Sequence, residues 1–242
     1  MCNNKIYLQR KYNYYISGFG MIGYNIFARD EDLSFLHPAE NVYYNSLKRE
    51  DQKKSYLLGR AAAKKAIEAL IPEVNKHDIF IDRGVFDFPV VKGIFAQNIQ
   101  VSISHCDDAG IAIAYPEDHP LGVDLEKVDT SKTEAMKRAM TSLELKLGSE
   151  SDLTFEQYCT TIWTIKEGLS KIFRTGLTLD FKLIELEHLT KKGTFYISTF
   201  KNFAQYKAVS YCSGEYVCSV VLPKNSDPEL DAFFDALDDL LG

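Results

Sequence analysis

The feature that most constrains the fold is a pattern that occurs in each half of the chain: a long helical stretch followed by several short runs with β-strand composition. Residues 46–70 predict the first long helix, which ends before Pro72 because the residue preceding a proline is pushed out of helical backbone angles. Residues 155–174 predict the second. This pattern indicates an α+β protein made of two related lobes.

The remaining elements are predicted from shorter patterns. The first 30 residues read as one or two strands with a glycine-rich turn at residues 18–23. Two further helices are expected, one at residues 133–147 and one from about residue 228 to the C-terminus. The runs with strand composition are residues 78–82, 99–104, 110–115, 121–128, 177–186, 194–200, 206–211 and 216–222.

Composition excludes several classes of protein. No run approaches the roughly eighteen apolar residues that a membrane span needs, and no apolar segment follows the first residues as in a secretion signal. The five cysteines are scattered, which argues against a disulfide framework and a zinc site and favours a reducing, cytoplasmic location. A formal net charge of −6 argues against a general nucleic-acid binder.

Two carboxylates share one face of a predicted strand. In the run Gly-Val-Asp-Leu-Glu at residues 122–126, alternation places Asp124 and Glu126 on one face and the apolar residues on the other. Such a pair can converge on a hard cation such as Mg²⁺. Taken alone, the motif fits a solvated strand face at least as well.

The second long helix carries charges opposite its apolar stripe. Glu167, Lys171 and Arg174 recur at helical spacing, one turn after Trp163. A carboxylate followed four residues later by an ammonium suits a metal–phosphate site, with Glu167 on the cation and Lys171 on a phosphate oxygen. An exposed ion pair within the helix is the simpler alternative. Gly168 indicates either a close approach at this point or a tolerated surface glycine.

The run at residues 101–105 ends in Ser104 and His105, which could donate hydrogen bonds to a phosphate. A serine nucleophile with a histidine base is disfavoured, because adjacent strand residues point to opposite faces. The alternative is a histidine that makes a turn hydrogen bond at the end of a strand.

The first long helix carries a basic stripe. Arg49, Lys53, Arg60 and Lys64 fall on one side of it, and four cations together in a net-acidic chain form a candidate surface for phosphate or an acidic partner. A solvated helix face remains the alternative, above all for the first two residues.

Together and in this order, these motifs resemble the 4′-phosphopantetheinyl transferase superfamily, and within it the larger pseudo-dimeric class that activates nonribosomal peptide and polyketide synthases. The resemblance rests on residues 58–64 (Leu-Gly-Arg-Ala-Ala-Ala-Lys), 102–105 (Ser-Ile-Ser-His), 122–126 and 163–171 (Trp-Thr-Ile-Lys-Glu-Gly-Leu-Ser-Lys). A softer match covers residues 138–144. The acidic strand and the long helix, about forty residues apart, form the most specific part of the combination.

The resemblance implies two similar α/β lobes related by a pseudo-twofold axis, with coenzyme A in the cleft between them. The lobes are then expected at residues 1–117 and 118–242. A double-length chain of this kind is expected to contain a complete site and to act as a monomer on an acyl, peptidyl or aryl carrier protein.

The resemblance also implies the roles of the site residues. Asp124, Glu126 and Glu167 are expected to hold Mg²⁺, or Mn²⁺ in its place, and Glu167 to deprotonate the carrier serine. Lys171 is expected to contact the transferred phosphate. The remaining residues expected to bind coenzyme A are Ser104 and His105 on phosphate oxygens, Arg60 on the 3′-phosphate, and Lys64 of the same basic stripe. The expected reaction transfers the 4′-phosphopantetheine group of coenzyme A to a serine of the carrier protein, and 3′,5′-ADP leaves.

One departure and three alternatives accompany this hypothesis. Family members often carry a Gly-x-Pro turn with a polar residue before the proline, whereas Phe88 precedes Pro89 here, with Lys92 nearby but off register. A degenerate member that binds coenzyme A or a carrier without transfer is therefore one alternative. A metal-dependent phosphoesterase or nuclease built on the same carboxylates is another, and a purely structural protein is the third.

Overall fold

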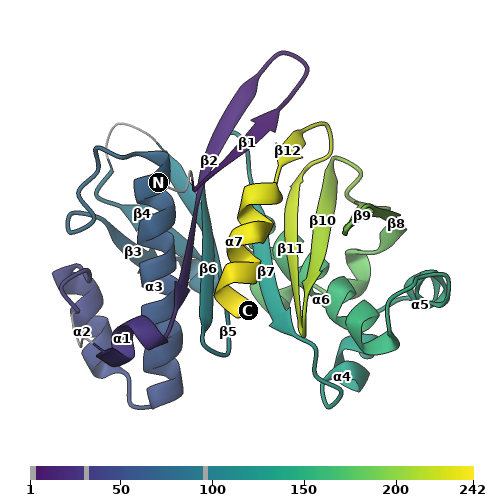
Figure 1. Ribbon diagram of the computed structural model, residues 1–242, viewed down its shortest axis with the longest axis horizontal. Coiled ribbons are helices and arrows are strands. Elements are labelled where there is room, and N and C mark those ends of the chain that lie inside the picture. Colours follow the sequence, from purple (N-terminus) through teal and green to yellow (C-terminus); the bar gives the residue numbers. More distant parts are fainter. Residues whose placement is uncertain (1–3, 30–32, 95–97) are drawn as a thin grey trace. The chain divides into compact units, whose positions relative to one another are not determined.

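The computed structural model describes residues 4–29, 33–94 and 98–242 (Figure 1). The chain forms two compact units, one of residues 1–120 with 227–242 and the other of residues 121–226. The sequence placed the boundary at residues 117/118 and all later residues in the second lobe, so residues 227–242 are grouped differently in the structure. Within the described residues, no helix combines the length and apolar character that crossing a membrane requires.

The first unit is an antiparallel five-stranded sheet with one long helix packed on it. The sheet order is β12-β1-β2-β6-β5, and helix α3 (Glu50–Leu70) packs against β2, β6 and β5 (Figure 1). The strands are β1 (Lys5–Gln9), β2 (Tyr14–Gly23), β5 (Ile99–Cys106), β6 (Ala109–Pro116) and β12 (Asp227–Glu229). A separate hairpin, β3 (Phe80–Arg83) and β4 (Pro89–Lys92), and helices α1 (Asn25–Arg29), α2 (Pro38–Ser46) and α7 (Asp231–Leu241) complete the unit.

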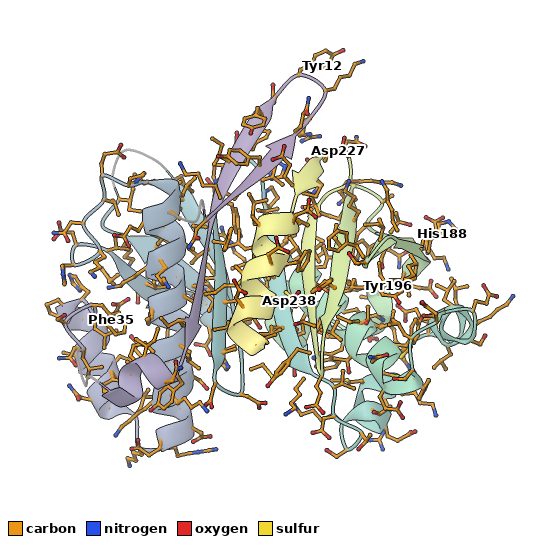
Figure 2. The ribbon with its side chains drawn as sticks, viewed as in Figure 1. Tyr12, Phe35, His188, Tyr196, Asp227 and Asp238 are labelled. Atoms are coloured by element: carbon orange, nitrogen blue, oxygen red, sulfur yellow. The ribbon has the colours of Figure 1, made fainter. Side chains whose placement is uncertain are left out.

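The predicted glycine-rich turn at residues 18–23 is wrong, because these residues lie inside β2. The turn is at residues 10–13 instead, and Figure 2 shows Tyr12 at the tip of the β1–β2 hairpin. Gly18 and Gly20 are needed because α3 lies directly on the strand. A Cβ atom would stand 2.1 Å from the Ala66 carbonyl oxygen at Gly18 and 2.2 Å from the Ala62 carbonyl oxygen at Gly20.

The C-terminal segment closes the first unit. Strand β12 pairs with β1, and α7 packs against β1 and β2. The apolar face of α7 buries Phe233, Phe234 and Leu237, and the ring of Phe233 meets Phe19 of β2 edge-on at 5.4 Å between centroids. The acidic C-terminal helix expected from the sequence therefore packs on the sheet that contains the chain's first strands.

The second unit has the same plan. Its antiparallel sheet has the order β7-β11-β10-β9-β8, and helix α6 (Phe155–Phe173) packs against β7, β11 and β10. The strands are β7 (Gly122–Lys127), β8 (Leu186–Lys192), β9 (Phe195–Phe200), β10 (Tyr206–Ser213) and β11 (Tyr216–Pro223). Helices α4 (Thr133–Arg138) and α5 (Ser142–Ser149) connect β7 to α6. The α+β class predicted from the sequence is confirmed.

Three expected elements are divided or replaced. The stretch 46–70 is the end of α2, a break and then α3, and the stretch 133–147 is interrupted before Thr141, whose side chain caps α5. The predicted strand at 177–186 is wrong. Short 3-10 turns at Gly176–Thr178 and Phe181–Leu183 stand there, and β8 begins only at Leu186.

Each unit contains a buried lysine–glutamate pair that ties its long helix to the start of a shorter one. In the first unit, Lys64 Nζ lies 2.7 Å from Glu40 Oε2, and the two side chains are 3% and 1% exposed. The same carboxylate accepts backbone hydrogen bonds from His37 at 2.9 Å and from Ile81, at the start of the β3–β4 hairpin, at 2.8 Å. One glutamate thus joins α2, α3 and β3.

The second unit repeats this arrangement atom for atom. Lys166 Nζ lies 2.8 Å from Glu144 Oε2, and both side chains are fully buried. Glu144 accepts backbone hydrogen bonds from Thr141 at 2.8 Å and from Leu186, at the start of β8, at 3.0 Å. One glutamate thus joins α5, α6 and β8, as Glu40 does for the first unit.

The lysines also use equivalent carbonyl groups. In each unit, two backbone carbonyls accept hydrogen bonds from the lysine. One belongs to the residue five positions before the glutamate, and the other to the residue five positions before the strand residue whose amide donates to the glutamate. The acceptors are Phe35 and Lys76 for Lys64, and Ala139 and Phe181 for Lys166. These matched contacts set a residue-by-residue correspondence between the two units that is not evident in their sequences.

Candidate functional site

A close approach of helix α6 to strand β7 positions the candidate site in the second unit. A Cβ atom at Gly122 would stand 1.9 Å from the Gly168 carbonyl oxygen, and one at Gly168 would stand 2.7 Å from the Val221 side chain. Only glycine at both positions lets the helix backbone lie this close to the sheet. Gly168 is therefore a packing requirement, and it brings the residue before it, Glu167, toward the acidic strand.

The three predicted metal ligands lie together in this part of the second unit. Asp124 is buried at 4% exposure, whereas Glu126 and Glu167 are partly buried. The apolar residues that alternate with the strand carboxylates, Val123 and Leu125, are fully buried, as the strand pattern predicted. Asp124 and Glu126 each act electrostatically on Glu167, which places one helix carboxylate beside two strand carboxylates.

Lys171 is joined to the strand side of this cluster. Its ammonium donates to Asp124 Oδ1 at 2.7 Å and to the Val123 carbonyl oxygen at 2.8 Å. It therefore bridges from the last turn of α6 back to β7. A second cation, Lys132, lies 3.6 Å from Glu126 Oε2, in the loop before α4. Lys171 was expected from the sequence and Lys132 was not.

Burial and mutual repulsion shift the acidities of the site. Burial raises the pKa of Glu167 to about 7, with a further increase from the charge of Asp124, while Lys171 acts in the opposite direction. The pKa of Glu126 is raised for the same two reasons, burial first and Asp124 second. Buried carboxylates whose pKa is raised in this way are stabilised in the charged form by any cation placed beside them.

The donor set fits a hard divalent cation by its chemistry. Three carboxylates from two rigid elements are oxygen ligands of the kind Mg²⁺ takes in proteins. Among the residues that the structure describes, no three His, Cys, Asp or Glu side chains are already arranged as a metal-ligand group. Asp124 faces the ammonium of Lys171 instead. A cation placed here would compete with the Lys171 ammonium for Asp124.

A network of hydroxyl groups lies under the acidic strand and was missed by the sequence reasoning. Thr164 Oγ1 lies 2.7 Å from Ser219 Oγ, which in turn lies 2.7 Å from Ser210 Oγ, and all three side chains are buried. Ser219 pairs directly with Asp124 across β7 and β11. The signals in the sequence are small polar residues among apolar positions, Thr164 in the helix and Ser219 in a strand.

Arg60, in the first unit, lines a small pocket. Its guanidinium lies 4.4 Å from the centre of the Tyr56 ring, and its side chain is 11% exposed. The pocket has a volume of about 80 Å³, and its other lining residues include Tyr43, Asp82 and Arg83. Two guanidinium groups beside aromatic rings form a setting that suits a phosphate or a planar group.

The other predicted residues of the first unit have different surroundings. Lys64 is buried in its pair with Glu40, so the structure gives it a role in holding the fold, and we leave it out of the proposed ligand-binding set. Ser104 is 6% exposed in β5, whereas the next residue, His105, is exposed. As alternation requires, these two side chains lie on opposite faces of the strand.

Phe88 has a structural role in the turn where the resemblance expected a polar residue. Its ring occupies the space beside Gly84, where a Cβ atom would stand 2.5 Å from the ring, and its carbonyl accepts a hydrogen bond from the Gly84 amide at 2.8 Å. Phe86 and Asp87 between them adopt left-handed backbone angles, with φ of 62° each. Lys92 pairs with Asp82 at 2.5 Å.

Comparison with known proteins supports the resemblance. Residues 120–221 match the family model of the 4′-phosphopantetheinyl transferase superfamily, and this segment contains all four charged residues of the cluster. Over this segment the match supports the superfamily that the sequence motifs indicated, whereas the larger pseudo-dimeric class stays a prediction. No curated protein matches the chain.

Several solved structures resemble part of the chain. A holo-(acyl-carrier-protein) synthase from Bacillus anthracis str. Ames in complex with CoA (3′,5′-ADP) is 22% identical, with a TM-score of 0.38, over 41% of this chain and 93% of that one. A holo-ACP-synthase from Plasmodium yoelii is 20% identical, with a TM-score of 0.32, over 41% of this chain and 91% of that one. A Thermotoga maritima holo-[acyl-carrier-protein] synthase is 21% identical, with a TM-score of 0.32, over 48% of this chain and 70% of that one.

Proposed function

We propose that this protein transfers 4′-phosphopantetheine from coenzyme A to a serine of an apo carrier protein, with Mg²⁺ as the metal. The observation that carries the proposal is the charged cluster of the second unit, where Asp124, Glu126 and Glu167 lie together with Lys171. The cluster falls within the segment that matches the superfamily. Phosphoryl transfer requires mainly positioning and charge stabilisation, which carboxylates, a metal and a lysine can supply.

The proposed reaction forms one bond and breaks one. The serine oxygen of the carrier attacks the phosphorus on the pantetheine side of the pyrophosphate, and the serine proton passes to Glu167 directly or through a water. The bond from that phosphorus to the bridging oxygen breaks, and its electron pair leaves with 3′,5′-ADP. When bound, Mg²⁺ would neutralise charge on the pyrophosphate oxygens.

The cations have separate proposed roles. Lys171 exchanges its contact with Asp124 for an oxygen of the transferred phosphate, which it can reach because its side chain is 25% exposed. Arg60, Ser104 and His105 of the first unit are proposed as further contacts for the phosphates of coenzyme A. Action on a carrier protein as a monomer in the cytoplasm belongs to the same proposal.

The test is intact-protein mass spectrometry of several apo carrier proteins incubated with this protein, coenzyme A and Mg²⁺. We expect a mass gain of one phosphopantetheine that is abolished by EDTA and by Asp124→Ala. A matched control is Glu134→Gln, which removes an exposed carboxylate of α4 outside the cluster and should transfer normally.

The same experiment separates the alternatives. A folded protein that binds coenzyme A but modifies no carrier would be a degenerate family member, and Phe88 would then be the first position to change. Release of phosphate from simple phosphate esters, without a carrier, would instead indicate a phosphoesterase.

A further inference from the structure

The first unit contains a cavity at the position that corresponds to the charged cluster of the second. The cavity has a volume of about 300 Å³, within the range of small-molecule sites. All its lining residues belong to the first unit and come from β2, α1, α3 and the segments around residues 35 and 76: Ile22, Ile26, Phe27, Phe35, Ala61, Lys64, Lys65, Glu68 and Lys76.

The glycine contacts establish the correspondence between β2 and β7. A Cβ atom at Gly18 would meet the Ala66 carbonyl, two residues after Lys64, and one at Gly122 would meet the Gly168 carbonyl, two residues after Lys166. Gly18 therefore corresponds to Gly122. Two and four residues further along each strand, Asp124 corresponds to Gly20 and Glu126 to Ile22.

The buried lysines establish the correspondence between the helices. Glu167 follows Lys166, and Lys65 follows Lys64, so the helix carboxylate of the second unit corresponds to an ammonium in the first. All three proposed metal ligands are therefore replaced, by a glycine, an isoleucine and a lysine. The first unit therefore has no carboxylate at the three positions that correspond to the proposed metal ligands, and the charge at the helix position has the opposite sign.

The same correspondence explains why there is an open volume. In the second unit, the rings of Trp163 and Phe181 pack with their centroids 5.1 Å apart. Trp163 lies three residues before Lys166, so its counterpart is Ala61, three residues before Lys64. The counterpart of Phe181 is Lys76, because its backbone carbonyl accepts a hydrogen bond from Lys64 and that of Phe181 accepts one from Lys166. Two aromatic rings are thus exchanged for a methyl group and a flexible lysine, and the cavity takes up the difference.

Among the described lining residues, the buried ones are mostly apolar, and the exposed ones at the edge are two lysines, a glutamate and an isoleucine. Phe27 and Phe35 face each other at 5.6 Å between ring centroids, and Figure 2 labels Phe35. Lys65 is exposed and uses one donor on the Met21 carbonyl at 3.0 Å, and Lys76 is exposed as well. Glu68 contributes a carboxylate to the part of the lining that the structure describes.

We propose that this cavity binds a small monocarboxylate with an apolar tail, such as a medium-chain fatty acid. The tail occupies the volume lined by Ile22, Phe27 and Phe35, and the carboxylate takes the ammonium groups of Lys65 and Lys76. The site requires neither metal nor coenzyme A, so the proposal stands independently of the function proposed above.

The test is isothermal titration calorimetry of the full chain with octanoate, in EDTA and without coenzyme A. We expect saturable binding of one octanoate, with octan-1-ol binding about threefold to tenfold more weakly because it lacks the charge. Lys65→Met should weaken octanoate binding by a similar factor and leave octan-1-ol binding unchanged. Acetate, which has the charge but no tail, should not bind measurably.

Two further variants test the location. Ala61→Trp restores the ring found in the second unit and should abolish binding by filling the cavity. If that variant does not fold, Ile26→Glu, at a side chain that is 54% exposed, places a negative charge at the edge and should weaken octanoate binding. Equal binding of octanoate and octan-1-ol, no saturable octanoate binding, or unchanged binding by a folded Ala61→Trp or by Ile26→Glu would overturn the proposal.

Discussion

Replacing Lys166 by methionine tests how strongly the buried ion pair holds the second unit together. The ammonium of Lys166 has three partners, all between 2.8 and 2.9 Å: Glu144 and the carbonyls of Ala139 and Phe181. Both side chains of the ion pair are fully buried. Methionine keeps most of the volume of the lysine and removes the charge, so the variant leaves a buried carboxylate whose remaining donors, among the described residues, are the backbone amides of Thr141 and Leu186.

The expected loss of stability is large. Removing one partner of a buried ion pair costs about 3–5 kcal/mol, because the other charge stays buried without compensation. Domain stabilities are about 5–15 kcal/mol, so this is a substantial part of the total. With a urea m-value of about 2 kcal/mol/M, a loss of about 4 kcal/mol lowers the unfolding midpoint by about 2 M.

The assay is urea unfolding followed by tryptophan fluorescence. The chain has a single tryptophan, and Trp163 lies in α6 one turn before Lys166, with its ring packed against Phe181. Its emission therefore reports the packing of the second unit around the ion pair. Far-ultraviolet circular dichroism on the same samples shows whether the variant is folded in the absence of urea.

Two controls make the result interpretable. Lys191→Met removes an ammonium whose partner is Asp152, but those side chains are 51% and 53% exposed, and the expected cost is at most about 1 kcal/mol. The double variant Glu144→Gln with Lys166→Met removes both buried charges and should regain most of the lost stability. A midpoint for Lys166→Met equal to that of Lys191→Met would refute the reasoning.

Three further predictions concern the charged cluster. Burial and the Asp124 charge raise the pKa of Glu167 from 4.5 to about 7, so the folded metal-free protein binds the Glu167 carboxyl proton more tightly than the unfolded chain does. The stability that results is present below pH 4.5 and is lost as the pH rises through 7. Melting temperatures measured in EDTA should therefore fall between pH 4.5 and 7, and Glu167→Gln should make this fall smaller. Gly122→Ala should lower the free energy of unfolding, measured in urea, by about 1–3 kcal/mol or more, because the added Cβ meets a helix carbonyl. Gly193→Asn, in an open turn with φ of 64°, should change the free energy of unfolding little. Lys171→Met should bind Mg²⁺ more tightly in a calorimetric titration, because Asp124 loses a competing ammonium, and yet transfer phosphopantetheine more slowly; weaker Mg²⁺ binding would contradict the arrangement seen here.

The candidate site was predictable because its residues follow local rules. Strand alternation placed Asp124 and Glu126 on one face, and helical spacing placed Glu167 one turn before Lys171. What the sequence could not give is the distance between the strand and the helix, because it depends on a glycine contact between residues far apart in the chain, Gly122 and Gly168.

A group of glycines and one lysine show how the structure departs from the sequence interpretation. Residues 18–23 contain three glycines and were read as a turn, whereas two of them serve as contact points for a helix within a strand. Lys64 was read with Arg60 as part of an exposed stripe, although it is 3% exposed. Sequence spacing shows that two cations share a helix face, but the burial of one of them depends on Glu40, in a different helix.

The two units show why some positions match while others differ. Changing either residue of a buried lysine–glutamate pair alone leaves an uncompensated charge at a cost of about 3–5 kcal/mol, so the pair can be exchanged only as a whole. Lys64 and Lys166 are accordingly the same in both units, whereas the next residue along each helix is a lysine in one and a glutamate in the other. The position beside the unchanged buried pair therefore carries opposite charges in the two units, and the two strand carboxylates of the second unit, Asp124 and Glu126, correspond to the uncharged Gly20 and Ile22 of the first.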